Sequence, residues 1–263
     1  MPRVSVIIPC FNDGQYLDES VGSALAQNYK DIQIIIVNDG STDSSTLQKL
    51  ASFSNPLITV LHKENGHLSS ARNHGIRYAS GEYILTLDAD DRFEPSFVGK
   101  AVNILDAKKE VGGVTCYLKS FGQKKFSWKP LGGDLRNFLY RQESCASAMF
   151  RKECWEKLGG YDEQMKTGYE DWEFWIRLTS AGYIVHVIKE FLFHYRITSK
   201  SMLLTESEPN RETIVNYILE KHRDIYWREL KDAVIQRKII DMRNPESTRI
   251  LMKNLYWRLI RKR

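Results

Sequence analysis

The sequence predicts an α/β protein whose sheet is mostly parallel and is flanked by helices. Short apolar runs rich in Val, Ile and Leu alternate with segments of helical periodicity over the first hundred residues. Strands that are apolar along their whole length are typical of parallel sheets, because helices cover both faces of such sheets. Polar residues follow several of these runs, at the strand ends where such sheets bind ligands.

The expected elements follow one another in a regular order. Strands are predicted at residues 4–11, 32–37, 57–63 and 83–87, with helices at 16–27, 44–52 and 68–79 between them. After about residue 111 the pattern loosens. There we expect a hairpin over 112–130, a strand at 144–152, a helix at 170–181 and two strands at 183–188 and 191–197. The region from residue 205 to 263 is predicted to be a basic helical extension, which leaves residues 1–204 as the main domain.

Composition excludes several classes of protein. Hydrophobic residues make up 42% and charged residues 27% of the 263 residues, so disordered and fibrous proteins are set aside. The four cysteines, Cys10, Cys116, Cys145 and Cys154, are scattered, so we expect buried thiols in a reducing compartment rather than a zinc site or disulfides. A strand-like run begins at Val4 and no apolar run has the length of a membrane span, so a cytoplasmic protein is expected.

Positive charge is concentrated late in the chain. Residues 221–263 contain 13 Lys and Arg against 5 Asp and Glu, although the net charge of the whole chain is only +5. Because aromatic and aliphatic residues are mixed with the basic ones, this region could lie peripherally on the inner face of a membrane, at roughly 1 kcal/mol per basic residue. A pair of helices packed on the body with a solvated basic face is the alternative. No nucleic-acid motif is present, so nucleic acid is not an expected partner.

Three aspartates follow the strand predicted at 83–87: Asp88, Asp90 and Asp91. Like charges at this spacing destabilise one another unless a positive charge lies among them. Carboxylates on a loop suit Mg²⁺ or Mn²⁺, which bind through one or two carboxylates and the phosphates of a substrate. The alternative is a polar turn that caps a helix beginning near Pro95.

Two phosphate-binding motifs are absent, while three longer blocks resemble a known family. Neither G-x-G-x-x-G after the first strand nor G-x-x-x-x-G-K-[ST] occurs. The blocks "VSVIIPCFNDGQYLDESVGSALAQNYKDIQIIIVNDGSTDSS", "GHLSSARNHGIRYASGEYILTLDADD" and "GGYDEQMKTGYEDWEFWIRLTSAGY" resemble glycosyltransferase family 2 over roughly residues 3–200. The resemblance implies a GT-A fold with a Rossmann-like sheet, a nucleotide-binding half at about 1–110 and an acceptor half at 111–204.

The resemblance implies a nucleoside pocket at the ends of the first two strands. Pro9, Phe11 and Asn12 would line this pocket. Asp39 would accept a hydrogen bond from a ring N–H of the base, which suits uracil. A buried carboxylate discriminates strongly between bases, because a base that lacks the donor leaves the carboxylate unpaired.

The diphosphate and the metal would lie further along the same edge. Arg72 would reach the nucleotide, with a surface salt bridge as its alternative role. Asp88 and Asp90 would form the D-x-D pair that contacts ribose and Mn²⁺ or Mg²⁺. Asp91 would support this pair or cap the next helix. Arg196 would clamp the diphosphate.

The family often has a histidine two positions after this arginine, but the sequence has Thr198 there. His194 is a possible substitute, and a hydrogen-bonded structural histidine is the alternative. The Q-x-x-R-W block of processive members is absent, so transfer of one sugar per encounter is expected.

The segment "TGYEDWEFWIRL" holds the expected catalytic carboxylates. The resemblance implies that Asp171 is the general base, a role worth about 10²–10⁴-fold in rate. Glu170 would orient Asp171 or bind hydroxyls of the acceptor. Capping of a helix N-terminus is the alternative for both residues.

The resemblance therefore implies an inverting, metal-assisted glycosyltransferase of polysaccharide biosynthesis. It would move one sugar from a nucleotide-sugar, a UDP-sugar foremost, to a hydroxyl of a glycan or lipid-linked acceptor. A sugar nucleotidyltransferase is one alternative, although it would need a Gly-rich basic loop where "PCFNDG" stands. A non-catalytic sugar-nucleotide-binding protein on the same fold is the other, and it would tolerate loss of Asp90 and Asp171.

Overall fold

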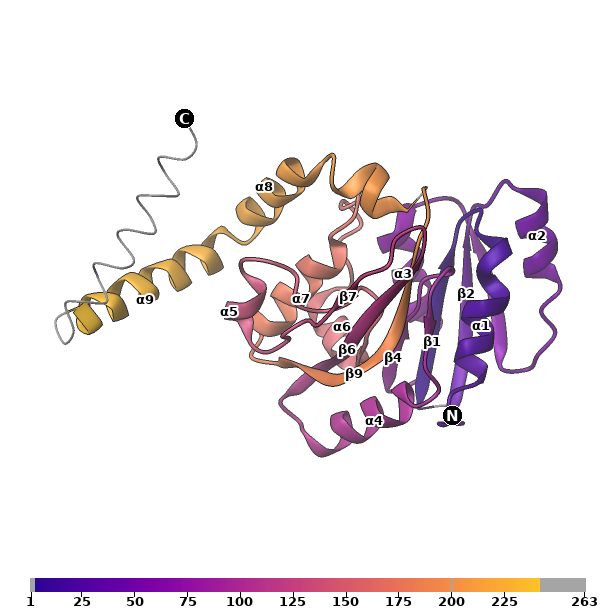
Figure 1. Ribbon diagram of the computed structural model, residues 1–263, viewed down its shortest axis with the longest axis horizontal. Coiled ribbons are helices and arrows are strands. Elements are labelled where there is room, and N and C mark those ends of the chain that lie inside the picture. Colours follow the sequence, from indigo (N-terminus) through magenta and orange to yellow (C-terminus); the bar gives the residue numbers. More distant parts are fainter. Residues whose placement is uncertain (1–2, 200, 242–263) are drawn as a thin grey trace. The chain divides into compact units, whose positions relative to one another are not determined.

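The computed structural model describes residues 3–199 and 201–241 (Figure 1). The chain divides into two compact units, Met1–Asn216 and Tyr217–Arg263. Within the described residues, the first unit contains a nine-stranded sheet in the order β3-β2-β1-β4-β8-β6-β9-β5, with β7 paired to β6. The predicted α/β class with helices against the sheet is confirmed.

The first half of the sheet is parallel, as predicted. Its strands are β1 (Val4–Cys10), β2 (Ile32–Asp39), β3 (Ile58–Lys63) and β4 (Tyr83–Thr86). The helices between them are α1 (Leu17–Leu25), α2 (Ser44–Ala51) and α3 (His67–Tyr78). Each lies within a residue or two of its predicted range, and the differences fall at the ends because apolar periodicity defines the middle of an element better than its ends.

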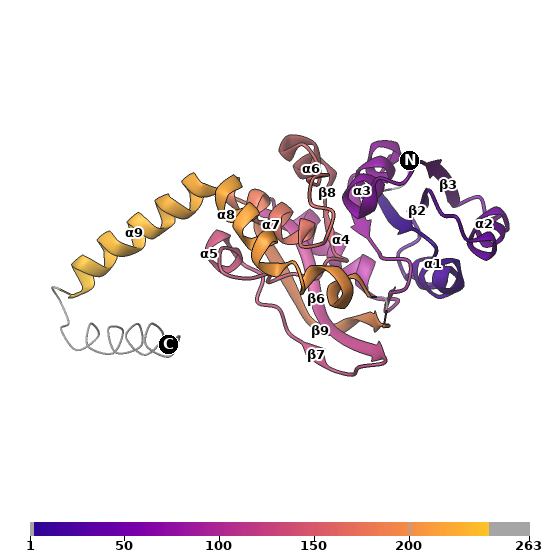
Figure 2. The same ribbon diagram turned by 90° about the horizontal axis from the view of Figure 1, so that it is seen from above.

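Helices α1 and α3 cover opposite faces of this half (Figure 2). Gly75 allows α3 to lie close to the sheet: a Cβ there would be 2.7 Å from Ile7 Cγ2 and 2.9 Å from Val37 Cγ2. Arg72 is three residues earlier on α3, so the same close packing carries its side chain over the sheet.

The second half of the sheet is mixed. β8 (Met149–Arg151) pairs antiparallel with β4 and with β6 (Val111–Gly122), and so joins the two halves. β9 (Ile184–Ile197) runs parallel to β6, whereas β5 (Arg92–Phe93) is antiparallel to β9. β7 (Ser127–Trp128) completes the predicted hairpin with β6. The helices of this half are α4 (Phe97–Ala107), α5 (Leu135–Phe138), α6 (Lys152–Leu158) and α7 (Glu170–Ser180).

The prediction of two strands within 183–197 is wrong, because β9 is one strand with a bulge. Ile188 pairs with Cys116 and Phe191 pairs with Tyr117, so two residues of β9 fall between neighbouring pairs. Both are charged and exposed, which interrupts the apolar pattern without ending the strand.

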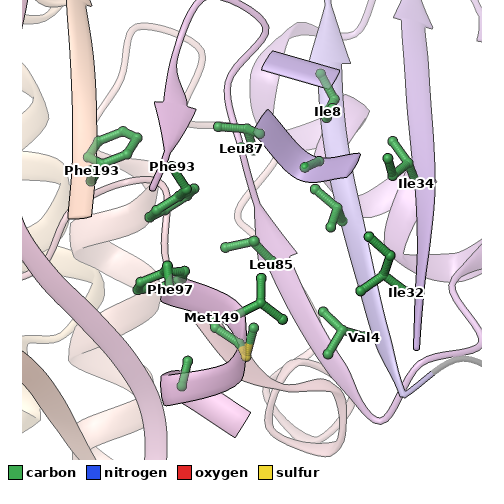
Figure 3. Close-up of a cluster of buried hydrophobic side chains, with 14 of the residues drawn as sticks. Val4, Ile8, Ile32, Ile34, Leu85, Leu87, Phe93, Phe97, Met149 and Phe193 are labelled. Carbon is green, nitrogen blue, oxygen red and sulfur yellow. The ribbon is translucent and has the colours of Figure 1, made fainter. Parts of the chain in front are cut away.

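One apolar core spans both halves of the sheet (Figure 3). Val4 and Leu85 come from the parallel strands and Met149 from β8. The Phe93 ring lies 4.8 Å from that of Phe193, centroid to centroid. The halves are therefore stabilised together. All four cysteines are buried and free, as predicted.

Helices follow β9. A π-helix (Leu203–Ser207) precedes α8 (Arg211–Lys221), and α9 (Arg223–Asp241) lies in the second unit. The helical extension is thus seen as far as residue 241, and residues 242–263 lie outside the described part. The predicted boundary near residue 204 stays a prediction, since the compact units divide between residues 216 and 217.

Membrane contact of this extension also stays a prediction. Trp227, Leu230 and Val234 are exposed at helical spacing on α9. Across residues 3–199 and 201–241, no helix combines the length and the apolar character that a membrane crossing requires.

Candidate active site

The candidate site lies where the parallel strands end. Cys10 and Asn38 are register partners, so β1 and β2 end level with each other. Among the described non-glycine residues, positive φ occurs at Asn12 (57°), His67 (66°) and Tyr169 (59°). All three lie within five residues of a predicted site residue. Such backbone conformations cost about 1–3 kcal/mol each and are found mainly at functional sites, where the surrounding structure enforces them.

Asn12 ties the end of β1 to the loop after β2. Its Oδ1 accepts hydrogen bonds from the backbone N–H groups of Thr42 and Asp43, both at 2.9 Å. Phe11 beside it is 47% exposed, whereas Pro9 is buried within β1. Phe11 is therefore the one of the three that could pack on a base without rearrangement. The nucleoside-binding roles of all three stay predictions.

Asp39 is a buried carboxylate that already has partners. It is 3% exposed, its Oδ1 lies 2.6 Å from Lys63 Nζ, and the same oxygen accepts the N–H of Gly66 at 3.0 Å. Both contacts are to Oδ1, so Oδ2 is the oxygen that a base N–H would reach. Its predicted hydrogen bond to a base is compatible with this geometry and stays a prediction.

Arg72 links two carboxylates from distant parts of the chain. Its side chain is fully buried, with Nη2 2.7 Å from Asp88 Oδ1 and Nη1 2.5 Å from Glu170 Oε1. Burial alone lowers the pKa of Arg72, but the charges of Asp88 and Glu170 outweigh burial and raise it. A surface salt bridge, the alternative role of Arg72, is wrong because nothing of this side chain is at the surface. Its contact with the nucleotide stays a prediction.

Asp90 and Asp91 lie among negative charges that the neighbouring Arg196 offsets only in part. Burial, followed by the charges of Asp88 and Asp13, raises the pKa of Asp90 to about 7. Asp91 is 1% exposed, and burial with the neighbouring aspartates raises its pKa well above the ordinary value. Its Oδ1 accepts the backbone N–H of Arg196 at 2.7 Å, and its buried Oδ2 has no hydrogen-bond partner among the described residues.

The capping alternatives for these carboxylates are wrong. Helix α4 begins at Phe97 with Ser96 at its N-cap, so none of the three aspartates caps it. Helix α7 has Tyr169 at its N-cap without a side-chain capping hydrogen bond, and Glu170 and Asp171 lie inside its first turn. Asp88 and Glu170 pair with Arg72, Asp171 accepts a hydrogen bond from Gln142, and Asp91 accepts the backbone N–H of Arg196.

Asp171 lines a cavity of about 220 Å³. It is 4% exposed and accepts a hydrogen bond from Gln142 Nε2. Burial raises the pKa of Asp171 to about 8, the charge of Glu170 adds to the rise and Arg72 opposes it. Asp88 lines the same cavity, whose apolar wall includes Leu118, Phe126, Trp128, Phe193, Met202 and Leu203. The cavity is therefore lined both by the expected base and by Asp88, the carboxylate expected on the donor side.

The raised pKa of Asp171 predicts a pH dependence of stability. Between about pH 4 and 8 the folded protein keeps a proton that the unfolded chain has released, so the free energy of unfolding falls as the pH rises. Asp171→Asn has no such proton. Urea unfolding near pH 6 and near pH 8 should show the variant gaining about 2 kcal/mol relative to the parent over this interval. A difference that stays constant with pH would contradict the raised pKa.

Arg196 contacts protein groups beside Asp90. Its Nε donates to the backbone oxygen of Asp90 at 2.9 Å, and its Nη2 lies 2.8 Å from Glu19 Oε1, without hydrogen-bond geometry. Its guanidinium carbon lies 4.6 Å and 4.4 Å from the ring centroids of Tyr16 and Phe121. The clamp on a diphosphate stays a prediction, and it would require some of these contacts to change.

His194 matches the structural alternative. Its Nε2 lies 2.6 Å from Glu94 Oε1. The neighbours Phe193 and Tyr195 line the cavity, and successive residues of a strand face opposite sides, so His194 faces away from the cavity.

Comparison with known proteins agrees with this arrangement. The family model described as Glycosyl transferase family 2 matches residues 5–164. The chain belongs to glycosyltransferase family 2. An uncharacterized glycosyltransferase of Rickettsia prowazekii (strain Madrid E), RP339, is 30% identical over 252 residues, which cover 91% of this chain and 75% of that one. The chondroitin synthase of Pasteurella multocida (strain Pm70) is 28% identical over 239 residues, or 85% of this chain.

The relatives differ widely in length from this glycosyltransferase. The match covers only 24% of the chondroitin synthase. An uncharacterized glycosyltransferase of Rickettsia bellii (strain RML369-C) is 45% identical over 105 residues, 40% of this chain and 15% of its own length.

Solved structures confirm the predicted GT-A fold of this glycosyltransferase. S. aureus TarS 1–349 in complex with UDP has a TM-score of 0.65 at 20% identity, covering 84% of this chain and 72% of that one. The mannosyltransferase PcManGT from Pyrobaculum calidifontis, in complex with GDP-Man and Mn²⁺, has a TM-score of 0.59 at 21% identity, covering 76% and 59%. At these identities the likeness is one of fold.

The carboxylates in this site suit a divalent cation whose remaining ligands are phosphate oxygens of the substrate. No group of three His, Cys, Asp or Glu in the described part of the chain is arranged to bind a metal ion by itself. Asp88 and Asp90 supply carboxylate oxygens, and the pKa of Asp90 is raised first by burial and then by the charges of Asp88 and Asp13, which a cation would offset. Two carboxylates completed by phosphate oxygens and water are a usual site for Mg²⁺.

Two partners in the site of this glycosyltransferase were not predicted from sequence. Lys63 is the last residue of β3 and lies beside Asp39. It could have been predicted, because polar residues at the ends of parallel strands lie at the edge where ligands bind. Gln142 lies in an irregular segment before β8, and no local pattern connects it with Asp171, 29 residues later.

Proposed function

We propose that this glycosyltransferase moves one sugar from a nucleotide-diphosphate donor, a UDP-sugar foremost, to a hydroxyl of a glycan or lipid-linked acceptor, with inversion. The main support is that Asp171 and Asp88 line one cavity and are connected through Arg72 and Glu170. An inverting enzyme needs a base on the acceptor side and charge stabilisation on the donor side. Asp171 would serve as the base, and Asp88 would serve the donor side through a divalent cation that it helps to hold.

The donor class is supported by the nucleotide side of the site and by the relatives. The buried carboxylate of Asp39 suits a ring N–H such as that of uracil, with Phe11 exposed nearby to pack on the base. TarS was solved with UDP-GlcNAc, and PcManGT with GDP-Man and Mn²⁺. The names chondroitin synthase and hyaluronan synthase among the relatives support a place in polysaccharide biosynthesis.

In the proposed transfer step, the acceptor oxygen bonds to the anomeric carbon while its proton passes to the ionised form of Asp171. The bond from that carbon to the diphosphate oxygen breaks, and its electron pair leaves with the nucleoside diphosphate. Attack opposite the leaving group inverts the anomeric carbon.

Neighbouring residues tune and position these groups. Burial, followed by the charge of Glu170, which Arg72 holds in place, raises the pKa of Asp171 and so makes it a stronger base. Asp88 and Asp90 would hold Mg²⁺ or Mn²⁺, which when bound stabilises charge on the leaving diphosphate.

Donor binding provides the test of this proposal. With Mn²⁺ present, UDP at a hundredfold excess over its Kd should raise the free energy of unfolding by about 2.7 kcal/mol. Asp90→Asn should lose the Mn²⁺ dependence, whereas Asp31→Asn, an exposed carboxylate before β2, should keep it. Thermal shifts with UDP, GDP and dTDP, with and without Mn²⁺, measure the effect.

The alternatives give different results in the same preparation. Hydrolysis of a UDP-sugar to UDP supports the transferase. Release of pyrophosphate from a nucleoside triphosphate and a sugar phosphate would contradict it, and so would equal stabilisation by UDP with and without metal.

A further inference from the structure

The β6–β7 hairpin contains basic residues but no acidic ones. Residues 117–129 contain four lysines and no Asp or Glu, whereas residues 1–220 together are slightly acidic. We call these the hairpin lysines: Lys119, Lys124, Lys125 and Lys129. All four are exposed, and within the described part of the chain their ammonium groups form no salt bridge or hydrogen bond. By contrast, Nζ of Lys100 on α4 lies 2.5 Å from Oε2 of Glu190 and forms a salt bridge with it.

Two of the hairpin lysines are held beside aromatic rings. Lys119 Nζ lies 4.9 Å from the centroid of Phe191, and Lys129 Nζ lies 5.5 Å and 5.7 Å from those of Tyr117 and Phe191. Rings attract the ammonium groups without neutralising them. The outward face of the hairpin therefore presents fixed, unpaired positive charge.

The inward face of the same hairpin is a wall of the cavity that Asp171 lines. Leu118 and Trp128 are paired across the hairpin and both line the cavity. Phe126 lines the cavity too, yet it is 46% exposed, so it marks the mouth. Lys124 and Lys125 directly precede Phe126. Positive charge thus stands at the entrance through which an acceptor would reach the base.

We propose that the acceptor is a glycan bearing negative charges, and that the β6–β7 hairpin binds it; this inference rests on the function proposed above. The accepting sugar lies in the cavity against Trp128, with its hydroxyl toward Asp171. The residues of the glycan beyond the mouth place their carboxylate or phosphate groups against Lys124 and Lys125. A neutral glycan would leave Lys124 and Lys125 at the mouth without partners, whereas an anionic one complements their charge.

A charged and an uncharged form of one glycan test this proposal. The probe is a hexamer of galacturonic acid, and its methyl ester is the matched neutral ligand. Calorimetry at low salt should show the acid form binding about tenfold more tightly than the ester. Lys124→Gln with Lys125→Gln should weaken the acid form about tenfold and leave the ester unchanged. Added salt should remove most of the difference, since exposed charges are screened.

The control removes the same charge elsewhere. Lys108 and Lys109 are exposed just before β6, at the strand end away from the hairpin. Lys108→Gln with Lys109→Gln should leave binding of both glycans unchanged. Because all four exchanged side chains are exposed, both double variants should keep the stabilisation by UDP that reports a folded donor site.

Two results would overturn the proposal. Equal affinity for acid and ester, or equal loss in both double variants, would mean that the hairpin does not recognise charge on the glycan. Binding to phosphatidylglycerol vesicles that Lys124→Gln with Lys125→Gln abolishes, without binding of the acid hexamer, would assign the hairpin to a membrane. Failure of the proposed function would look different from failure of this inference. If the protein is not a sugar transferase, the parent protein should not hydrolyse the UDP-sugar even in the absence of an acceptor.

Discussion

Replacing Asp171 by Asn is expected to lower the turnover of sugar transfer about 10²–10⁴-fold. Asn has nearly the same shape, and its side-chain oxygen can still accept the hydrogen bond from Gln142. It cannot take the proton of the acceptor hydroxyl. The variant should therefore keep the KM for the donor and lose turnover, as initial rates at varied UDP-sugar and fixed acceptor would measure.

Two comparisons separate loss of the base from loss of structure. Asp31→Asn removes an exposed carboxylate before β2, and its turnover should match the parent. Asp171→Asn should still be stabilised by UDP. If its turnover stays within a few fold of the parent, Asp171 is not the base; if stabilisation by UDP is lost as well, the residue supports the fold of the site.

Replacing Arg72 by Met is expected to lower the free energy of unfolding by about 3–5 kcal/mol. The guanidinium is fully buried between Asp88 and Glu170, and Glu170 is itself 3% exposed. Met fills a similar volume but leaves the Glu170 carboxylate buried without an opposite charge, which is the costly way to break a buried ion pair. Urea unfolding at neutral pH measures the effect.

A second substitution identifies the cause of this loss. Glu170→Gln removes the stranded charge, so Arg72→Met with Glu170→Gln should recover part of the stability, with a coupling of about 0.5–3 kcal/mol. Lys49→Met is the control: its partner Asp18 is 70% exposed, and such pairs contribute about 0–1 kcal/mol. Additive effects of the Arg72 and Glu170 substitutions would show that packing, and not the ion pair, accounts for the loss.

Local patterns in the sequence determined the first half of the fold. Because β1, β2 and β4 are buried on both faces, their apolar runs read directly as parallel strands. The same reasoning located Asp39 and Asp88 at strand ends, since polar residues stop such strands at the edge where ligands bind. The family blocks then pointed to Glu170 and Asp171, which no periodicity singles out.

Tertiary structure decided which of these carboxylates have partners. Arg72 and Glu170 are 98 residues apart in the chain, and they meet because β8 joins the second half of the sheet to the first. A carboxylate in the first turn of a helix can cap it, bind a cation or pair with a buried arginine, and the sequence is compatible with all three. Packing alone selects among them.

The same holds for the protonation of the base. By its place in the first turn of α7, Asp171 should have a lowered pKa, because the helix dipole favours negative charge there. Its pKa is instead raised to about 8, since burial and the neighbouring Glu170 outweigh the dipole. Residue type and spacing thus identified the chemical groups, whereas desolvation and distance, which arise only when remote segments pack together, set their charge.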